Sequence, residues 1–125
     1  MKPTLLFVDD DADVSEAFSD LFEMAGWTVA CARDGLEALD WLATHPPPEV
    51  VVLDLKMPTC DGYEFRRRQL ADPRLKDLPT VVFTADAHVE AVHSSLLAAV
   101  PIVRKSAEFT QLLATIERVR GRPGG

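Results

Sequence analysis

The chain has 125 residues and a formal net charge of −7, with 47% hydrophobic and 26% charged residues. These values predict one globular domain and argue against direct binding to nucleic acid or to an anionic membrane, both of which favour a basic face. The cysteines Cys31 and Cys60 lack a metal-binding spacing, and no signal peptide or membrane-spanning run is visible, so we expect a cytoplasmic protein with free thiols.

Short apolar runs alternate along the chain with longer amphipathic stretches. The short runs are rich in valine, leucine and isoleucine and mostly lack alternation, a pattern typical of strands buried on both faces of a sheet. They predict five strands, at residues 4–8, 28–32, 50–55, 80–84 and 102–104.

The stretches between these runs have helical periodicity. The first helix is expected to end at Gly26, since glycine suits the left-handed cap position, and the second before the prolines at 46–48. Ser106 is the expected N-cap of the last helix. The helical patterns run over residues 14–25, 36–42, 63–70, 88–99 and 109–119.

The alternation of strands with helices predicts an α/β fold. Parallel strands need crossover connections, so five β-α repeats imply a five-stranded parallel sheet that is doubly wound, with helices on both faces. No second domain is visible. We expect one domain over residues 1–120, followed at residues 121–125 by a flexible tail or the start of a linker.

Polar side chains stand at four of the predicted strand ends. The first strand ends at Asp9 and Asp10, the third at Asp54, the fourth at Thr84 and the fifth at Lys105. Ligands of open parallel sheets bind beyond the carboxyl ends of the strands. We therefore expect these five side chains to converge on one crevice.

The chemistry of this set favours phosphoryl transfer. Three carboxylates in one pocket cannot all stay ionised without a cation, and Mg²⁺ binds through one or two carboxylates while it keeps waters and phosphate oxygens. Lys105 can neutralise phosphoryl oxygens, Thr84 can donate a hydrogen bond to one of them, and a carboxylate can act as the nucleophile.

Other charged residues have simpler interpretations. Asp11 and Asp13 are expected to begin the first helix, where the helix dipole stabilises carboxylates. Residues Arg66, Arg67 and Arg68 are expected to form a solvated face of the third helix.

Several motifs together resemble the receiver domain of bacterial two-component response regulators, which is the CheY-like family. The motifs are FVDD at 7–10, VVLDLKMP at 51–58 followed by CDGYEF, LPTVVFTA at 78–85, and Lys105. They cover essentially the whole chain, and both their order and their spacing agree with the family. The resemblance implies a flavodoxin-like fold with strand order 2-1-3-4-5.

The same resemblance assigns roles to the residues of the crevice. It implies that Asp54 is the phosphoacceptor and that Thr84 and Lys105 contact the phosphoryl group. The implied Mg²⁺ ligands are the side chains of Asp10 and Asp54, Asp9 through a metal-bound water, and the backbone carbonyl of Lys56.

The resemblance also implies a function in two-component phosphorelay signalling. A receiver takes its phosphoryl group from a sensor histidine kinase or a histidine phosphotransfer protein, and often from small donors such as acetyl phosphate. It is a signalling domain rather than an enzyme, although it can catalyse its own phosphorylation and dephosphorylation. Phosphorylation reshapes the face made by helix four, strand five and helix five, which then acts on a downstream protein target or an effector domain.

The sequence departs from the family pattern at two positions. Ser106 stands where the family usually has a cis-proline, and Ile102 where it usually has an aromatic ring. A cis bond to serine costs about 2.5–4 kcal/mol, so the loop after Lys105 is expected to be strained or rearranged. These departures leave open an alternative, a phosphorylation-independent interaction module with a receiver fold.

The acidic run at residues 9–13 has features of two other classes of site. A phosphatase with an aspartate nucleophile is a third possibility, which turnover of a phosphate ester by a variant lacking Asp54 would support. A calcium-binding EF-hand loop is disfavoured, because Val14 and Asp20 stand where that loop needs glycine and glutamate.

Overall fold

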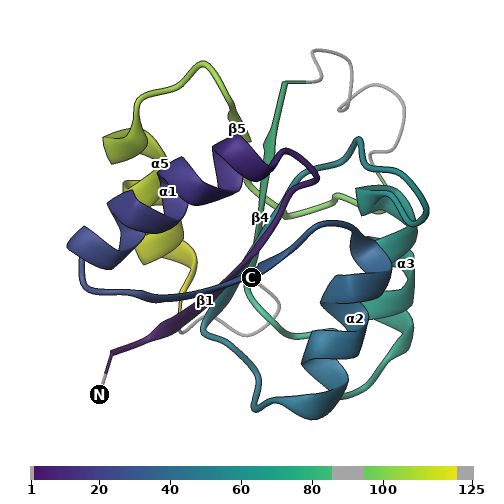
Figure 1. The fold of residues 1–125 in the computed structure, drawn as a ribbon. Helices are drawn as coiled ribbons and strands as arrows, with labels where there is room; N and C mark the ends of the chain where they lie inside the picture. Colours follow the sequence, from purple (N-terminus) through teal and green to yellow (C-terminus); the bar gives the residue numbers. More distant parts are fainter. Residues whose placement is uncertain (1, 86–94, 121–125) are drawn as a thin grey trace.

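The computed structural model describes residues 2–85 and 95–120, in which strands and helices alternate (Figure 1). The strands are β1 (Thr4–Val8), β2 (Thr28–Ala32), β3 (Val50–Leu53), β4 (Thr80–Thr84) and β5 (Ile102–Arg104). The helices are α1 (Ala12–Met24), α2 (Gly35–Thr44), α3 (Gly62–Ala71) and α5 (Phe109–Val119).

The five strands form one parallel sheet in the order β2-β1-β3-β4-β5, as predicted. Four strands have the predicted bounds, but β3 ends at Leu53 and not at Leu55. The reason is that Leu53 pairs with Val8, the last residue of β1. The chain beyond Leu53 therefore has no further strand partner on that side and turns into the loop that carries Asp54.

The sheet separates two apolar cores, because alternate strand residues point to opposite faces. Figure 1 shows α1 and α5 on one face and α2 and α3 on the other. Leu5 and Phe7 of β1 belong to the core under α1 and α5, here called the α1–α5 core. Leu6 and Val8 belong to the α2–α3 core on the opposite face.

The α1–α5 core is rich in phenylalanine. The rings of Phe18 and Phe83 lie 5.1 Å apart between centroids, and those of Phe22 and Phe109 lie 5.0 Å apart, in edge-to-face geometry. Such pairs contribute about 0.5–1.5 kcal/mol each beyond the area that they bury. Since these rings come from α1, β4 and α5, they hold both helices against the sheet.

Aspartates begin three of the helices. Asp11, Asp34 and Asp61 are the N-caps of α1, α2 and α3, and each accepts hydrogen bonds from backbone N–H groups of the first turn. Asp13 lies in the first turn of α1 as predicted. Gly26 follows the end of α1 with φ +98°, which confirms the predicted left-handed position.

The predicted N-cap of the last helix is wrong. Glu108, and not Ser106, precedes the first residue of α5, and its side chain makes no capping hydrogen bond. The N–H of Ala107 donates to the carbonyl of Arg104 at 2.9 Å, which closes a turn around Lys105 and Ser106. Because this turn follows β5 directly, the helix can begin only after it.

The prediction that three arginines form a solvated face of α3 is only partly correct. Arg67 and Arg68 are exposed and share the carboxylate of Glu64, at 2.6 and 2.7 Å. Arg66 is buried instead, with 5% of its surface exposed. It lies one turn after Gly62, on the side of the helix that packs into the protein.

Some predictions lie outside the described residues. The predicted fourth helix lies outside the described residues over 88–94, and so does the predicted tail at 121–125. Residues 95–99, the rest of that predicted helix, form a turn. Cys31 and Cys60 are free thiols, as expected. In the part of the chain that the structure describes, no helix combines the length and the apolar character needed to cross a bilayer.

Arg74 stabilises the end of α2 from a distance. It follows α3 in the chain, and its guanidinium donates to the carbonyl of Leu42 and, at 2.7 Å, to that of His45. These carbonyls lie at the C-terminus of α2, whose last turn contains no basic residue. Since a cation there satisfies carbonyls and opposes the helix dipole, Arg74→Met is expected to lower the free energy of unfolding by about 1 kcal/mol.

Urea denaturation followed by circular dichroism measures this loss. Arg33→Met is the matched control, because the side chain of Arg33, which precedes α2, is 78% exposed and pairs at the surface with Glu37 of α2. Its substitution is expected to change little. Equal losses in the two variants would contradict a capping role for Arg74.

Candidate functional site

The residues predicted to form the crevice do follow the carboxyl ends of neighbouring strands. Asp9 and Asp10 follow β1, Asp54 follows β3, Thr84 is the last residue of β4, and Lys105 follows β5. The backbone N–H of Lys105 donates to the carbonyl of Thr84 at 3.0 Å. The structure therefore places these residues at one edge of the sheet.

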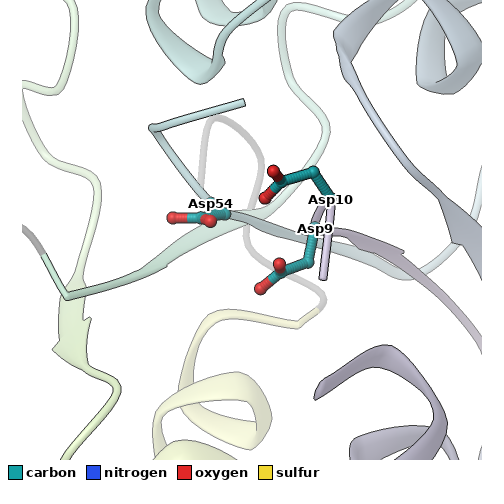
Figure 2. Close-up of side chains that lie close together, drawn as sticks. All are labelled: Asp9, Asp10 and Asp54. Atoms are coloured by element: carbon teal, nitrogen blue, oxygen red, sulfur yellow. The ribbon is translucent and has the colours of Figure 1, made fainter. Parts of the chain in front are cut away.

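The three aspartates of this edge form a compact cluster. One carboxylate oxygen from each of Asp9, Asp10 and Asp54 can be chosen so that all three lie within 4.8 Å of one another. Figure 2 shows the three carboxylates on the same side of the strand ends. Asp9 and Asp54 are buried, with 1% and 6% of their surface exposed, whereas Asp10 is exposed. The cluster is thus closed at its base and reachable from solvent at Asp10.

Backbone groups fix the two buried aspartates. The N–H of Asp9 donates to the carbonyl of Ala32 at 3.0 Å, and that of Asp54 to the carbonyl of Val8 at 2.9 Å, which extends the sheet by one residue on each strand. Oδ1 of Asp9 accepts from the N–H of Asp11, and Oδ1 of Asp54 from the N–H of Leu55. Each carboxylate therefore has one oxygen held by the main chain.

Lys105 joins the two buried carboxylates through their other oxygens. Its Nζ lies 2.8 Å from Oδ2 of Asp9 and donates a hydrogen bond to Oδ2 of Asp54 at 3.1 Å. Burial alone would lower the pKa of Lys105, but the neighbouring carboxylates of Asp54 and Asp9 outweigh it and raise that pKa. Lys105 therefore stays an ammonium ion at neutral pH.

Ser106 does not prevent this contact. In the described residues no peptide bond is cis, so the bond between Lys105 and Ser106 is trans. The ammonium group of Lys105 still reaches Asp54. That the loop is strained or rearranged stays a prediction.

Lys105 offsets only part of the cost of ionising Asp54. Burial raises the pKa of Asp54, and the charge of Asp9 raises it further, whereas Lys105 and the N–H of Leu55 lower it. The net pKa is above the ordinary value of a carboxyl group. The ionised form of Asp54 is thus disfavoured, and a second cation beside it would relieve this cost.

The donor set fits a hard divalent cation. Mg²⁺ prefers oxygen ligands and binds through one or two carboxylates, and the three aspartates offer carboxylate oxygens within 4.8 Å of one another. Oδ2 of Asp9 is buried and is paired with Lys105 alone among the described residues. The chemistry of these residues therefore fits Mg²⁺.

Comparison with known families identifies the family of the chain. The family model of the response regulator receiver domain matches residues 5–117, a range that includes Asp9, Asp10, Asp54, Thr84 and Lys105. The chain belongs to the receiver domain family. Receiver domains are signalling domains of two-component systems, in which a histidine kinase is the partner, and they typically bind Mg²⁺ at an acidic pocket.

Curated relatives of this receiver domain are response regulators. It is 42% identical to response regulator MprA of Mycobacterium sp. strain KMS over 87 residues, which are 68% of this chain and 36% of the relative. It is 35% identical to the DNA-binding dual master transcriptional regulator RpaA of Synechocystis sp. over 88 residues, which are 70% of this chain and 36% of the relative. The receiver domain thus spans little more than a third of these relatives.

Solved structures agree with this assignment. The chemotaxis response regulator CheY4 of Vibrio cholerae matches with a TM-score of 0.83 at 28% identity, over 95% of this chain and 99% of that chain. This confirms the CheY-like, flavodoxin-like fold that the motifs predicted. Lys56 lies in the loop after β3, and the role of its backbone carbonyl stays a prediction.

One residue of the site was visible in the sequence but was given no role. A Cβ atom on Gly62, the first residue of α3, would lie 2.4 Å from the backbone oxygen of Asp54 and 2.7 Å from Cα of Leu55. Only glycine allows the helix to approach the loop this closely. The signal is a glycine directly after the N-cap Asp61, eight positions after an aspartate at a strand end.

Proposed function

We propose that this receiver domain accepts a phosphoryl group on Asp54 in a Mg²⁺-dependent reaction, from a histidine kinase or a histidine phosphotransfer protein in the cytoplasm. The observation that carries the proposal is the meeting of three carboxylates and one ammonium ion at the strand ends. Oxygens of Asp9, Asp10 and Asp54 lie within 4.8 Å, and Lys105 Nζ lies 3.1 Å from Oδ2 of Asp54.

Asp54 supplies the nucleophile in this reaction. An oxygen of its ionised carboxylate attacks phosphorus, the bond from phosphorus to the histidine nitrogen of the donor breaks, and that nitrogen keeps the electron pair. The product on this chain is an acyl phosphate. The N–H of Leu55 orients the carboxylate through Oδ1, and Lys105 favours the ionised form that the attack needs.

The surrounding residues neutralise the charge that is transferred. In this proposal Lys105 moves from the Asp54 carboxylate to a phosphoryl oxygen, and the hydroxyl of Thr84 donates a hydrogen bond to another. Asp10, Asp54, Asp9 through a water, and the carbonyl of Lys56 would hold Mg²⁺. When bound, Mg²⁺ supplies positive charge that offsets the phosphoryl oxygens.

The proposal extends to the fate of the phosphoryl group. Small donors such as acetyl phosphate can replace the histidine donor, since the acceptor site is complete within this chain. Water that enters beside the exposed Asp10 can hydrolyse the acyl phosphate. The signal passes through the face that includes β5 and α5 to a protein target or an effector domain.

Replacement of Asp54 by asparagine is expected to abolish phosphorylation. Wild-type protein incubated with acetyl phosphate and Mg²⁺ should gain the mass of one phosphoryl group, which hydroxylamine removes because the bond is an acyl phosphate. Asp54→Asn should gain none, since an amide oxygen is a poor nucleophile. Intact-protein mass spectrometry measures both, and removal of Mg²⁺ with EDTA should slow the wild-type reaction sharply.

Asp61→Asn is the matched control. Asp61 lies in the same loop as an N-cap, and asparagine caps a helix as well as aspartate does, so phosphorylation should persist. A phosphoryl group on Asp54→Asn would contradict the assignment of the acceptor. If Asp54→Ala binds a partner as well as phosphorylated wild type does, the phosphorylation-independent interaction module becomes the better description.

A further inference from the structure

Arg66 has a buried guanidinium group that pairs with no acidic side chain among residues 2–85 and 95–120. Only 5% of the surface of Arg66 is exposed, and burial lowers its pKa with no opposing contribution from a carboxylate. Its Nε donates to the carbonyl of Leu96 at 3.1 Å, and its Nη1 donates to Oε1 of Gln69 at 3.0 Å. A buried charge is costly unless its hydrogen bonds are satisfied, so its position depends on these two acceptors.

Gln69 fixes the orientation of Arg66 from the same helix. The amide nitrogen of Gln69 donates to the carbonyl of Leu75 at 3.2 Å and to Oγ1 of Thr80 at 3.0 Å. Gln69 is completely buried, and Thr80 begins β4. One side of the guanidinium is therefore anchored to the sheet, and the other side reaches Leu96.

The segment that Arg66 reaches leads directly into β5. Leu97 and Val100 are buried against Leu55 and Val82. Between them, Ala99 has φ +64°, a left-handed conformation that is costly for a residue with a Cβ atom. The hydrogen bond from Arg66 to Leu96 holds the chain three residues before this strained position.

The opposite end of the same helix touches the acceptor aspartate. The N–H of Leu55 donates to Oδ1 of Asp54, and the carbonyl of Leu55 accepts from the N–H of Gly62 at 3.0 Å. Gly62 and Arg66 are four positions apart, which is one helical turn. The contact with the loop that carries Asp54 and the guanidinium that contacts Leu96 thus lie one turn apart on the same helix.

We propose that Arg66 is a positioning residue for the response to phosphorylation, which couples the loop after Asp54 to the segment of residues 96–102. Through this hydrogen bond, movement of α3 changes the strained turn at Ala99 and the entry into β5. The inference rests on the proposed function, because it needs a ligand-induced change at Asp54. Direct coupling between two sites has to be measured, since a connected path of contacts does not establish it.

The experiment uses beryllofluoride with Mg²⁺, an analogue of the phosphoryl group, and records backbone amide chemical shifts. In wild type, addition of beryllofluoride should shift amides in two regions, residues 54–62 and residues 96–102. In Arg66→Met, which keeps an unbranched side chain but no donors, the shifts at 54–62 should persist. Those at 96–102 should fall to less than half of their wild-type size.

Two variants separate coupling from stability. Phe22→Leu removes apolar contacts from the α1–α5 core, on the other face of the sheet from Arg66, so it should lose stability and keep the response at 96–102. Arg67→Met makes the same substitution at the exposed neighbour, whose guanidinium pairs with Glu64, and should behave as wild type does. If Arg66→Met does not fold, Arg66→Lys carries the test, since lysine has a methylene group at the chain position where Nε of Arg66 donates to Leu96.

The amide shifts of these variants distinguish failure of the Arg66 inference from failure of the proposed function. A full response at residues 96–102 in Arg66→Met, or in Arg66→Lys where that variant carries the test, overturns the inference. So does an equal loss of response in Phe22→Leu, which would make the effect one of stability. A wild-type response at 54–62 that never reaches 96–102 overturns the inference alone. No wild-type response at 54–62 overturns the proposed function, and the inference with it.

Discussion

Replacement of Gly62 by alanine is expected to lower the free energy of unfolding by about 3 kcal/mol and to slow phosphorylation of Asp54 about a hundredfold. The added Cβ would lie 2.4 Å from the backbone oxygen of Asp54 and 2.7 Å from Cα of Leu55. Both neighbours are backbone atoms, which cannot rotate away. Either α3 or the loop must therefore move, and the loop carries the nucleophile.

Urea denaturation and the rate of phosphorylation from acetyl phosphate measure the two effects. Gly26→Ala is the matched control, because Gly26 has φ +98° but a Cβ added there would meet nothing within 4 Å. Alanine there should cost about 1 kcal/mol through backbone strain and leave the phosphorylation rate of the folded protein unchanged. A normal rate in Gly62→Ala would contradict the close packing of α3 on Asp54.

Replacement of Lys105 by methionine is expected to destabilise the Mg²⁺-free protein by about 2 kcal/mol, less than the full cost of breaking a buried ion pair. The discount applies because 24% of the Lys105 side chain is exposed. Without the ammonium group, Asp9 and Asp54 keep their charges side by side with no compensating cation. The same change should enlarge the stabilisation by Mg²⁺, since the ion then meets an uncompensated cluster.

Thermal denaturation with and without millimolar Mg²⁺ measures this effect. The melting temperature should rise in both proteins, because Mg²⁺ binds the folded site, and it should rise more in Lys105→Met than in wild type. The control is Lys76→Met, since Lys76 is exposed on the loop after α3. An equal rise in wild type and Lys105→Met would show that lysine and metal do not share the same negative charge.

The crevice could be predicted from sequence because its residues are tied to strand ends. Each strand is a short apolar run, and the first polar side chain after it marks the edge of the sheet. Asp9 and Asp54 were therefore placed correctly without any knowledge of side-chain packing. The predicted end of β3 at Leu55 was wrong, because Leu55 continues the apolar run although the neighbouring strand β1 has already ended at Val8.

The buried arginine could not be predicted in this way. The sequence has three consecutive arginines at 66–68. Each of them suits an exposed helix face. The burial of Arg66 depends on Leu96, which is 30 positions away, and on the side chain of Gln69. The prediction of Ser106 as an N-cap was wrong because it, too, considered local preference alone. Local preference allows a helix start there, but the turn that closes between Arg104 and Ala107 delays it.

The division of the interior into an α1–α5 core and an α2–α3 core has a consequence for how this domain can change. The phenylalanine rings of the α1–α5 core lie on the face of the sheet opposite to α3, the helix that carries Arg66. Substitutions in separate clusters tend to add in their effects. Stability gained by repacking these phenylalanines would thus leave the surface of α2 and α3 free to diverge toward new partners.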